Sequence, residues 1–293
     1  MTRRRRTVAA LAVLAVASGA AIYGIHLWGQ YGERILPSER CTATLGEDAN
    51  TLSAEQAGNA ALIAAASARL GLPARAATIG IATAMQESSL INIDYGDRDS
   101  LGLFQQRPSQ GWGTEDEILD PYYSSDTFFA ALARVEGWED MEVTVAAQTV
   151  QRSAFPDAYA RREPGARLWA SALRGYSGAA AVTCDVGEGD GTTAQEFAAR
   201  VDRDFGEGRY EVSVLSATSE AIWLDVVPAG SDQVLAASFA SWAVAVAADE
   251  SIEAVANGDA GWDREQGAGV IDVPQPAAGI AVRLTPVDLT PEG

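Results

Sequence analysis

One glutamate at the end of an apolar helical segment is placed to do acid–base chemistry. Glu87 follows the run Ala74–Met85, which is apolar on nearly every side of a helical wheel, and a short helix of that kind belongs in the centre of a domain. Only small side chains share the helical face of Glu87, namely Ala76, Gly80, Thr83 and Ala84. A carboxyl at the end of a buried helix is partly desolvated, which raises its pKa toward the range of a general acid at neutral pH. The alternative is a surface glutamate at a frayed helix end, and periodicity alone weighs the two equally.

Composition excludes several other chemistries. The only histidine, His26, lies inside the N-terminal apolar segment, so Ser-His-Asp and Cys-His catalysis and histidine-ligated metal sites are excluded for the folded domain. No cofactor and no metal are expected. The net charge of −19 argues against nucleic-acid binding, which needs a dense basic surface.

The residues that follow Glu87 carry a family resemblance. Glu87-Ser88 is followed, after a loop of about a dozen residues, by the segment Ser100-Leu101-Gly102-Leu103-Phe104-Gln105-Gln106. The pair of motifs resembles the Glu-Ser and Ser-x-Gly-Leu-Met-Gln motifs of the lytic transglycosylase (SLT-type, lysozyme-like) family, over about residues 55–175. The resemblance implies a lysozyme-like domain in which Glu87 is the single acid/base. In that family the glutamate cleaves the glycosidic bond between N-acetylmuramic acid and N-acetylglucosamine in peptidoglycan.

The resemblance also implies substrate-binding residues. Ser88 and Gln105 are expected to hold sugar hydroxyls or N-acetyl groups and to orient Glu87, and Phe104 to shape an apolar wall. Gln106 and Trp112 continue the same loop and are further candidates. Trp112 is either a ring on which a sugar stacks or a buried plug.

One family motif is incomplete in this chain. The third motif, Ala-x-Tyr-Asn-x-Gly, is expected near residues 146–151, where the sequence reads Ala-Ala-Gln-Thr-Val-Gln and lacks both the Tyr and the Asn. Gln148 and Gln151 are expected to bind sugar in their place. Tyr159 is a candidate for the hydroxyl that contacts the catalytic glutamate in the family.

The loop Asn92–Asp99 allows three interpretations. Asp97 is a candidate second carboxylate, which would convert the site into a lysozyme-type hydrolase. Asp94, Asp97 and Asp99 together are hard oxygen ligands of the kind that suits calcium, although the spacing of an EF-hand is missing. The third interpretation is a solvated polar loop.

The N-terminus predicts a membrane anchor. Four arginines at residues 3–6 precede an uncharged run from Val8 to Trp28, which is long enough as a helix to span a bilayer. The positive-inside rule then predicts a single-pass protein of the cell membrane, with everything after Trp28 on the outer side. The alternative is a cleaved signal peptide with Ala15-Val16-Ala17 as its cleavage site.

The two cysteines, Cys41 and Cys184, lie near the two ends of the first predicted domain. An even pair in an oxidising compartment most often forms a disulfide. The alternative is two unpaired buried cysteines.

These signals divide the chain into five parts and predict an α+β fold. They are the anchor (1–30), a stalk (31–50), a mainly helical lysozyme-like domain (51–184), a linker (185–192) and a small α+β domain (193–293). In the lysozyme-like domain, helices are expected at 53–70, 73–88, 124–135, 144–152 and 165–173. In the last domain, helices are expected at 194–204 and 231–248, and strands at 210–215, 221–226, 252–256, 269–273 and 280–284.

The leading hypothesis is therefore a membrane-tethered peptidoglycan-cleaving enzyme whose partners are glycan strands and the membrane. The alternative is a non-catalytic wall-binding or export-apparatus scaffold protein, which the incomplete third motif favours. Residues 185–293 carry 5 arginines against 20 acidic residues, so the last domain is a candidate surface for a protein partner.

Overall fold

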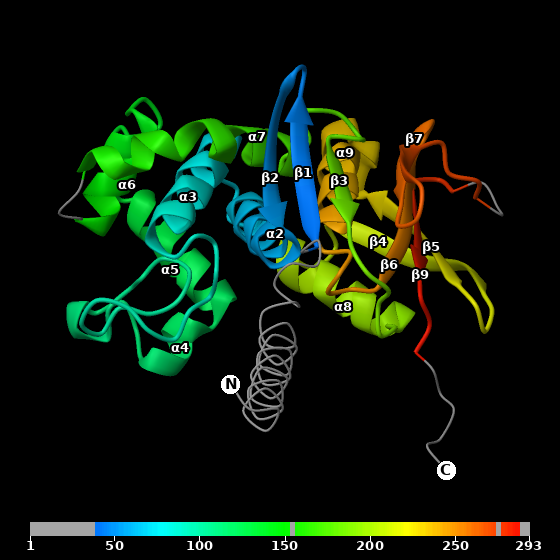
Figure 1. The fold of residues 1–293 in the computed structure, drawn as a ribbon, viewed down its shortest axis with the longest axis horizontal. Coiled ribbons are helices and arrows are strands. Elements are labelled where there is room, and N and C mark those ends of the chain that lie inside the picture. The colour runs from blue at the N-terminus through cyan, green and yellow to red at the C-terminus, as the bar shows by residue number, and fades with distance from the viewer. Residues whose placement is uncertain (1–38, 153–155, 274–276, 288–293) are drawn as a thin grey trace, which may run out of the picture. The chain divides into compact units, whose positions relative to one another are not determined.

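The described part of the protein is built from α-helices and two antiparallel β-sheets (Figure 1). The computed structural model describes residues 39–152, 156–273 and 277–287. The α-helices are α2 (Ala54–Arg69), α3 (Ala74–Glu87), α4 (Glu115–Leu119), α5 (Pro121–Leu132), α6 (Val143–Gln151), α7 (Glu163–Leu173), α8 (Ala194–Phe205) and α9 (Gln233–Ala245). The strands are β1 (Arg40–Leu45), β2 (Asp48–Ser53), β3 (Val182–Asp185), β4 (Tyr210–Ala217), β5 (Ile222–Pro228), β6 (Ile252–Asn257), β7 (Ala260–Asp263), β8 (Gly267–Gly269) and β9 (Ile280–Leu284). The α+β class was predicted correctly.

A three-stranded sheet makes the expectation of a mainly helical first domain wrong. Its strand order is β2-β1-β3, and both pairings are antiparallel. Residues 40–50, expected in a stalk, form most of the β1–β2 hairpin. Cys41 and Ala43 are buried while the threonines beside them are more exposed, which is the period-two alternation of a half-buried strand. Gly46 closes the two-residue loop with a φ of 62°, as tight hairpin loops require.

The expected membrane location is the second correction. Within residues 39–152, 156–273 and 277–287, no helix is long and apolar enough to cross a bilayer. The predicted anchor at residues 1–30 lies outside the described residues. The single-pass topology is therefore not supported by any helix of the structure.

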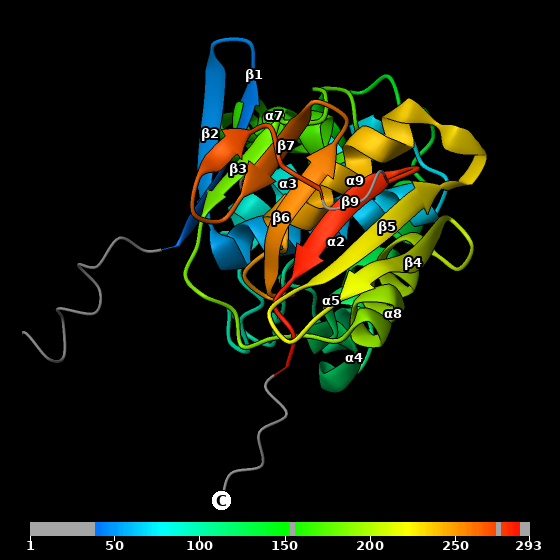
Figure 2. The same cartoon turned by 90° about the vertical axis from the view of Figure 1, so that its right-hand side faces the viewer.

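The second sheet has six strands, in the order β4-β5-β9-β6-β7-β8. The last strand in the described residues, β9, pairs with β5 on one side and β6 on the other, in antiparallel register. Figure 2 looks onto this part of the fold. Helix α9 packs on β6 and β3, and α8 packs on β4. An aromatic cluster fills the space around these two helices; its members are Phe197, Phe205, Tyr210, Phe239 and Trp242.

The disulfide between Cys41 and Cys184 is confirmed. The two residues are direct partners in the register of β1 and β3, and both are buried. The bond closes a loop with a sequence separation of 143 residues. It ties the first strand of the described chain to the strand that follows the helical segment.

The first prediction concerns the state of these thiols. Thiol titration of the denatured, unreduced protein is expected to find no reactive group, because both sulfur atoms are in the bond. The same titration after reduction should find both cysteines and serves as the control. Two reactive thiols before reduction would contradict the bond.

The segment 185–192, predicted as a linker, forms hydrogen bonds with residues that precede it and with residues that follow it in the chain. The backbone amide of Gly187 donates to Glu39 at 2.8 Å, and that of Gly191 donates to the hydroxyl of Ser251 at 3.0 Å. The Arg264 guanidinium donates to the carbonyl of Gly187. One buried hydrophobic core contains residues from before and after this segment. The boundary between two domains at this place stays a prediction.

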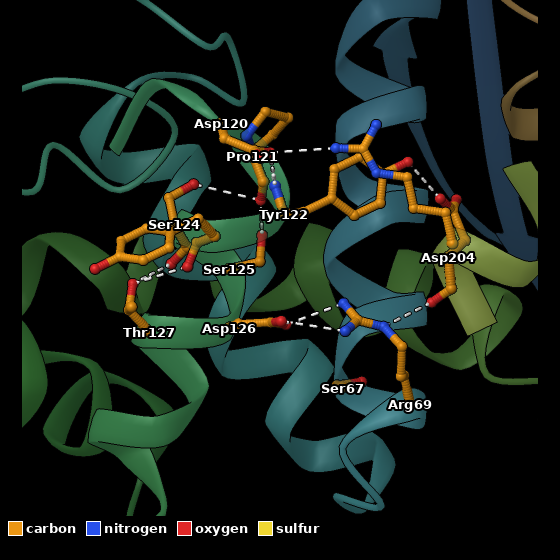
Figure 3. Close-up of polar contacts among 12 residues, drawn as sticks. Ser67, Arg69, Asp120, Pro121, Tyr122, Ser124, Ser125, Asp126, Thr127 and Asp204 are labelled. Carbon is orange, nitrogen blue, oxygen red and sulfur yellow. Dashed lines mark hydrogen bonds and ion pairs between the residues drawn. The ribbon is translucent and has the colours of Figure 1, made fainter. Parts of the chain in front are cut away.

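A polar junction joins the helical segment to α8 (Figure 3). Arg69 of α2 forms a bidentate contact with Asp126 of α5, at 3.1 and 3.0 Å, and donates to the backbone carbonyl of Asp204 at 3.2 Å. The Tyr122 hydroxyl of α5 donates to the Asp204 carboxylate at 2.6 Å. Asp204 is 1% exposed, so these bonds lie inside the molecule. Residues from both predicted domains therefore share one buried polar network.

Candidate functional site

Helix α3 is the central helix of the segment, as the sequence predicted. Ten of its residues are buried, and it packs against α2, α5, α6 and α7. A Cβ added at Gly80 would lie 2.9 Å from Ile63 and 2.9 Å from Phe129. The small residues of this helix therefore allow close approach on several sides, and the helix delivers its last residue, Glu87, at the end of a rigid element.

Glu87 has the environment of a general acid. Its side chain is half-buried, and burial raises its pKa above the ordinary value of a carboxyl. Hydrogen bonds from the side chains of Tyr159 and Gln151 lower the pKa, with a smaller effect than that of burial. The Tyr159 hydroxyl donates to the Oε1 atom of Glu87. The two donors stabilise the charged form that remains after the proton has left.

Tyr159 and Gln151 reach Glu87 from outside α3. Tyr159 lies on the 3₁₀ helix η3 (Pro156–Arg161) and is fully buried. Gln151 is the last residue of α6, and its amide nitrogen donates to the backbone carbonyl of Phe104 at 2.7 Å. Gln151 therefore connects the loop that follows Glu87 to the carboxyl itself.

The chain turns sharply directly after Glu87. Ser89 and Leu90 have φ angles of 56° and 59°, which residues other than glycine rarely adopt. The Ser88 hydroxyl donates to the carbonyl of Leu103 at 2.8 Å and is buried. In this structure Ser88 binds the loop to the end of α3, so its contact is with protein. Strain of this kind is often concentrated at functional sites.

Phe104 and Gln106 belong to the core. Phe104 is fully buried, and its ring stacks on Phe128 with a centroid separation of 4.4 Å. Gln106 is 1% exposed, and its amide nitrogen donates to the carbonyl of Ser124 at 3.0 Å. These two side chains hold the loop against α5.

Gln105 lies between these two residues and is half-buried. Its backbone φ is 48°, and its amide nitrogen donates to the carbonyl of Tyr95 at 3.3 Å. The same loop is closed by Asp99, which accepts from Arg107 at 2.7 Å and from the backbone amide of Ser109 at 2.8 Å. Hydrogen bonds from the side chain and the backbone of Ser109, and then from Arg107, hold the pKa of Asp99 well below its usual range.

A groove of about 980 Å³ lies between α5 and α6 and reaches Gln151. Trp112 is half-buried and lines this groove. A second hollow, of about 290 Å³, is lined by Met85 and Ser89, which stand two residues before and two residues after Glu87. Gln151, which lines the groove, is hydrogen-bonded to Glu87, whereas Glu87 itself lines neither the groove nor the hollow.

Gln148 and Asp97 are the other residues that the sequence predicted for the site. Gln148 is half-buried on α6 and lines neither the groove nor the hollow. Asp97 is exposed and pairs with Arg98 at 3.9 Å, and it lines neither of them either. Within the described residues no group of acidic, cysteine or histidine side chains has the arrangement of a metal site.

Sequence reasoning missed several residues of the site. Arg134 and Arg152 line the groove, and Arg161 and Arg162 line the hollow. The sequence holds no motif that brings these four together, because they come from different elements. No protein-family model and no curated protein matches the chain, so the chemistry of the site rests on its own geometry.

Proposed function

We propose that the protein is a peptidoglycan-cleaving enzyme, a lytic transglycosylase in which Glu87 is the single acid/base. The observation that carries the proposal is the environment of Glu87. This carboxyl ends a buried helix, its pKa is raised by burial, and it accepts a hydrogen bond from the buried hydroxyl of Tyr159. Tyr159 supplies the hydroxyl for which the sequence offers no Tyr at residues 146–151.

The proposed reaction uses one carboxyl group twice, first as an acid and then as a base. Protonated Glu87 gives its proton to the glycosidic oxygen as the bond from N-acetylmuramic acid to N-acetylglucosamine breaks. The carboxylate then takes the proton of the C6 hydroxyl, whose oxygen bonds to the anomeric carbon and closes a 1,6-anhydro ring. Water is neither consumed nor released. Tyr159 and Gln151 stabilise the carboxylate between the two steps.

The exposure of Asp97 supports this one-carboxylate mechanism over a hydrolase. Retaining and inverting hydrolases need a second carboxyl group within about 5–9.5 Å of the acid. Asp97 is 90% exposed and pairs with Arg98, an arrangement that suits a solvated loop.

The second candidate function is a non-catalytic protein that binds cell-wall glycan. The missing Asn of the third motif favours it, since Gln151 donates to Phe104 and Glu87 and is already engaged with protein. In this case the groove would bind glycan without cleaving it.

Release of soluble fragments separates the two candidates. The full chain is incubated with purified sacculi, and soluble muropeptides are measured over time beside bound protein. We expect release that grows with time and enzyme concentration. Binding without release would support the second candidate and contradict the first.

The second prediction concerns Tyr159. In Tyr159→Phe the hydrogen bond that stabilises the charged carboxyl is lost, so the pKa of Glu87 rises further. Because the general acid must be protonated, the alkaline limb of the pH profile of kcat/KM should move to higher pH. A hydrogen bond to a charged group contributes about 1.5–3 kcal/mol, so the maximal rate should fall about 10- to 160-fold.

Tyr176→Phe is the matched control, because that side chain is 63% exposed. It should leave the pH profile and the rate unchanged. A Tyr159→Phe profile whose alkaline limb stays in place, or moves to lower pH, would contradict the role given to Tyr159.

A further inference from the structure

The turn after Glu87 places two consecutive residues in a conformation that normally suits glycine. Helices often end on one left-handed residue, which is usually glycine, whereas Ser89 and Leu90 are both left-handed here. A residue with a side chain is less stable in this conformation, because its Cβ atom lies too close to the following carbonyl oxygen. Other contacts must therefore hold the turn.

Helix α2 supplies such contacts through two amide side chains. The Gln56 amide nitrogen donates to the carbonyl of Ser89 at 2.8 Å. The Asn59 amide nitrogen donates to the carbonyl of Leu90, also at 2.8 Å. Because Gln56 and Asn59 are three positions apart, they are neighbours on the surface of the helix. Each left-handed residue thus has its carbonyl oxygen hydrogen-bonded to the same rigid element.

The same turn also closes the end of α3. Leu90 is fully buried, and its backbone amide donates to the carbonyl of Ala84 at 3.0 Å, while the amide of Ser88 donates to that carbonyl at 3.1 Å. Glu87 lies between Ala84 and Ser88 in the chain. A contact that fixes the turn therefore also fixes the backbone from which the Glu87 carboxyl projects.

Resting on the function proposed above, we propose that Gln56 and Asn59 are positioning residues for Glu87. They act through the backbone of the turn and keep the last turn of α3 wound, so that the carboxyl stays beside the hydroxyl of Tyr159. Without them the turn relaxes and the carboxyl gains water. Because burial is the largest cause of its raised pKa, the pKa of Glu87 then falls toward its ordinary value.

The test determines the pKa of Glu87 in the full chain without any substrate. The free energy of unfolding is measured by urea unfolding of wild type and Glu87→Gln from acidic to neutral pH. The difference between the two proteins changes with pH between the unfolded and the folded pKa of Glu87. The same pair is then made with Asn59→Leu, which is similar in size but has no donor. We expect the difference to change less with pH in this second pair.

Hydrogen exchange reports on the turn itself. Asn59→Leu leaves the buried carbonyl of Leu90 without this donor, which is worth about 5- to 140-fold in an opening equilibrium. The backbone amides of Ser88 and Leu90 should exchange faster by about that factor. Gln56→Met is the second variant if Asn59→Leu does not fold. Its effect should be about 2- to 12-fold, because Ser89 is exposed and its carbonyl can bind water instead.

Ser238→Ala is the matched control, because the Ser238 hydroxyl donates to the carbonyl of Leu173, the last residue of α7, at 2.6 Å. It removes a donor from the end of another helix and should leave the pKa of Glu87 unchanged. Ser89→Gly is the rescue, since glycine adopts the left-handed conformation without strain. In that background Asn59→Leu should accelerate exchange less.

Three results would overturn the inference. They are an Asn59→Leu chain that behaves like Ser238→Ala, faster exchange with an unchanged pKa of Glu87, and an equal effect of Asn59→Leu with and without Ser89→Gly. These measurements need no cleavage, so they stand apart from the proposed function, which fails if the unmodified chain releases no muropeptides. In the active enzyme, Asn59→Leu should move the alkaline limb of kcat/KM to lower pH, opposite to Tyr159→Phe.

Discussion

Replacing Glu87 by glutamine is expected to lower the rate of glycan cleavage by roughly 10²- to 10⁴-fold, the usual contribution of general acid–base catalysis. Glutamine has nearly the same size and polarity but cannot give up or take the proton. Binding of the glycan should survive, because the amide still accepts the hydrogen bond from Tyr159. The measurement is the initial rate of muropeptide release by wild type and variant at equal concentrations.

The free energy of unfolding of Glu87→Gln is the control, because it shows whether a loss of activity comes from a loss of folding. Burial raises the pKa of Glu87 in the folded state. As pH rises from the unfolded pKa through the folded one, the folded protein therefore holds more protons than the unfolded chain, and the free energy of unfolding falls. Glutamine does not titrate, so Glu87→Gln should be at least as stable as wild type at neutral pH. Wild-type cleavage by a stably folded variant would remove Glu87 from the mechanism.

The second large effect is expected at Asp204, through stability. The buried Asp204 carboxylate accepts from Arg200 at 2.9 Å, from Tyr122 at 2.6 Å and from the indole of Trp242 at 2.7 Å. In Asp204→Ala these donors lose their acceptor inside the protein. Breaking a buried charge pair in this way costs about 3–5 kcal/mol of the free energy of unfolding.

Asp202→Asn is the matched control, because Asp202 is exposed on the same helix, α8, and also loses one negative charge. It should change the free energy of unfolding by less than about 0.5 kcal/mol. Urea unfolding, followed by tryptophan fluorescence and circular dichroism, should give one coincident transition for all three proteins. Separate transitions, or an Asp204→Ala cost no larger than that of the control, would contradict a shared polar junction.

Two helices whose first residues carry a local sequence signal were predicted well. The helix Ala54–Arg69 begins at the capping box of Ser53 and Gln56, and α3 begins after Pro73, within a residue or two of the expected positions. Each of these signals acts through neighbouring residues alone. Strand β9 was also predicted to the residue, at Ile280–Leu284.

The missed strands depend on contacts made across the fold. The β1–β2 hairpin is formed by residues expected in a stalk, and its partner strand β3 comes from the far side of the helical segment. Strand β7 was missed because Gly261-Trp262-Asp263 has no clear alternation. Trp262 is buried there and donates to the carbonyl of Cys184 at 2.9 Å.

At the site, residue type predicted some roles and not others. Glu87 was singled out because its helix is apolar on nearly every side and because the motifs that follow it resemble those of a known family. Phe104 and Gln106 were expected to face a sugar, but a loop phenylalanine or glutamine can equally face the core, and here both do. The contact of Tyr159 with Glu87 joins residues 72 positions apart, so only the fold brings them together.

The identity of the product end tests the central claim most directly. The full chain digests purified sacculi in water enriched in heavy oxygen, and the soluble muropeptides are analysed by mass spectrometry. If Glu87 acts as acid and then as base toward the C6 hydroxyl, every new muramic acid end is a 1,6-anhydro ring. Such an end is lighter by one water than a reducing end and carries no heavy oxygen. New reducing ends that contain heavy oxygen would show that water is the nucleophile and would contradict the account.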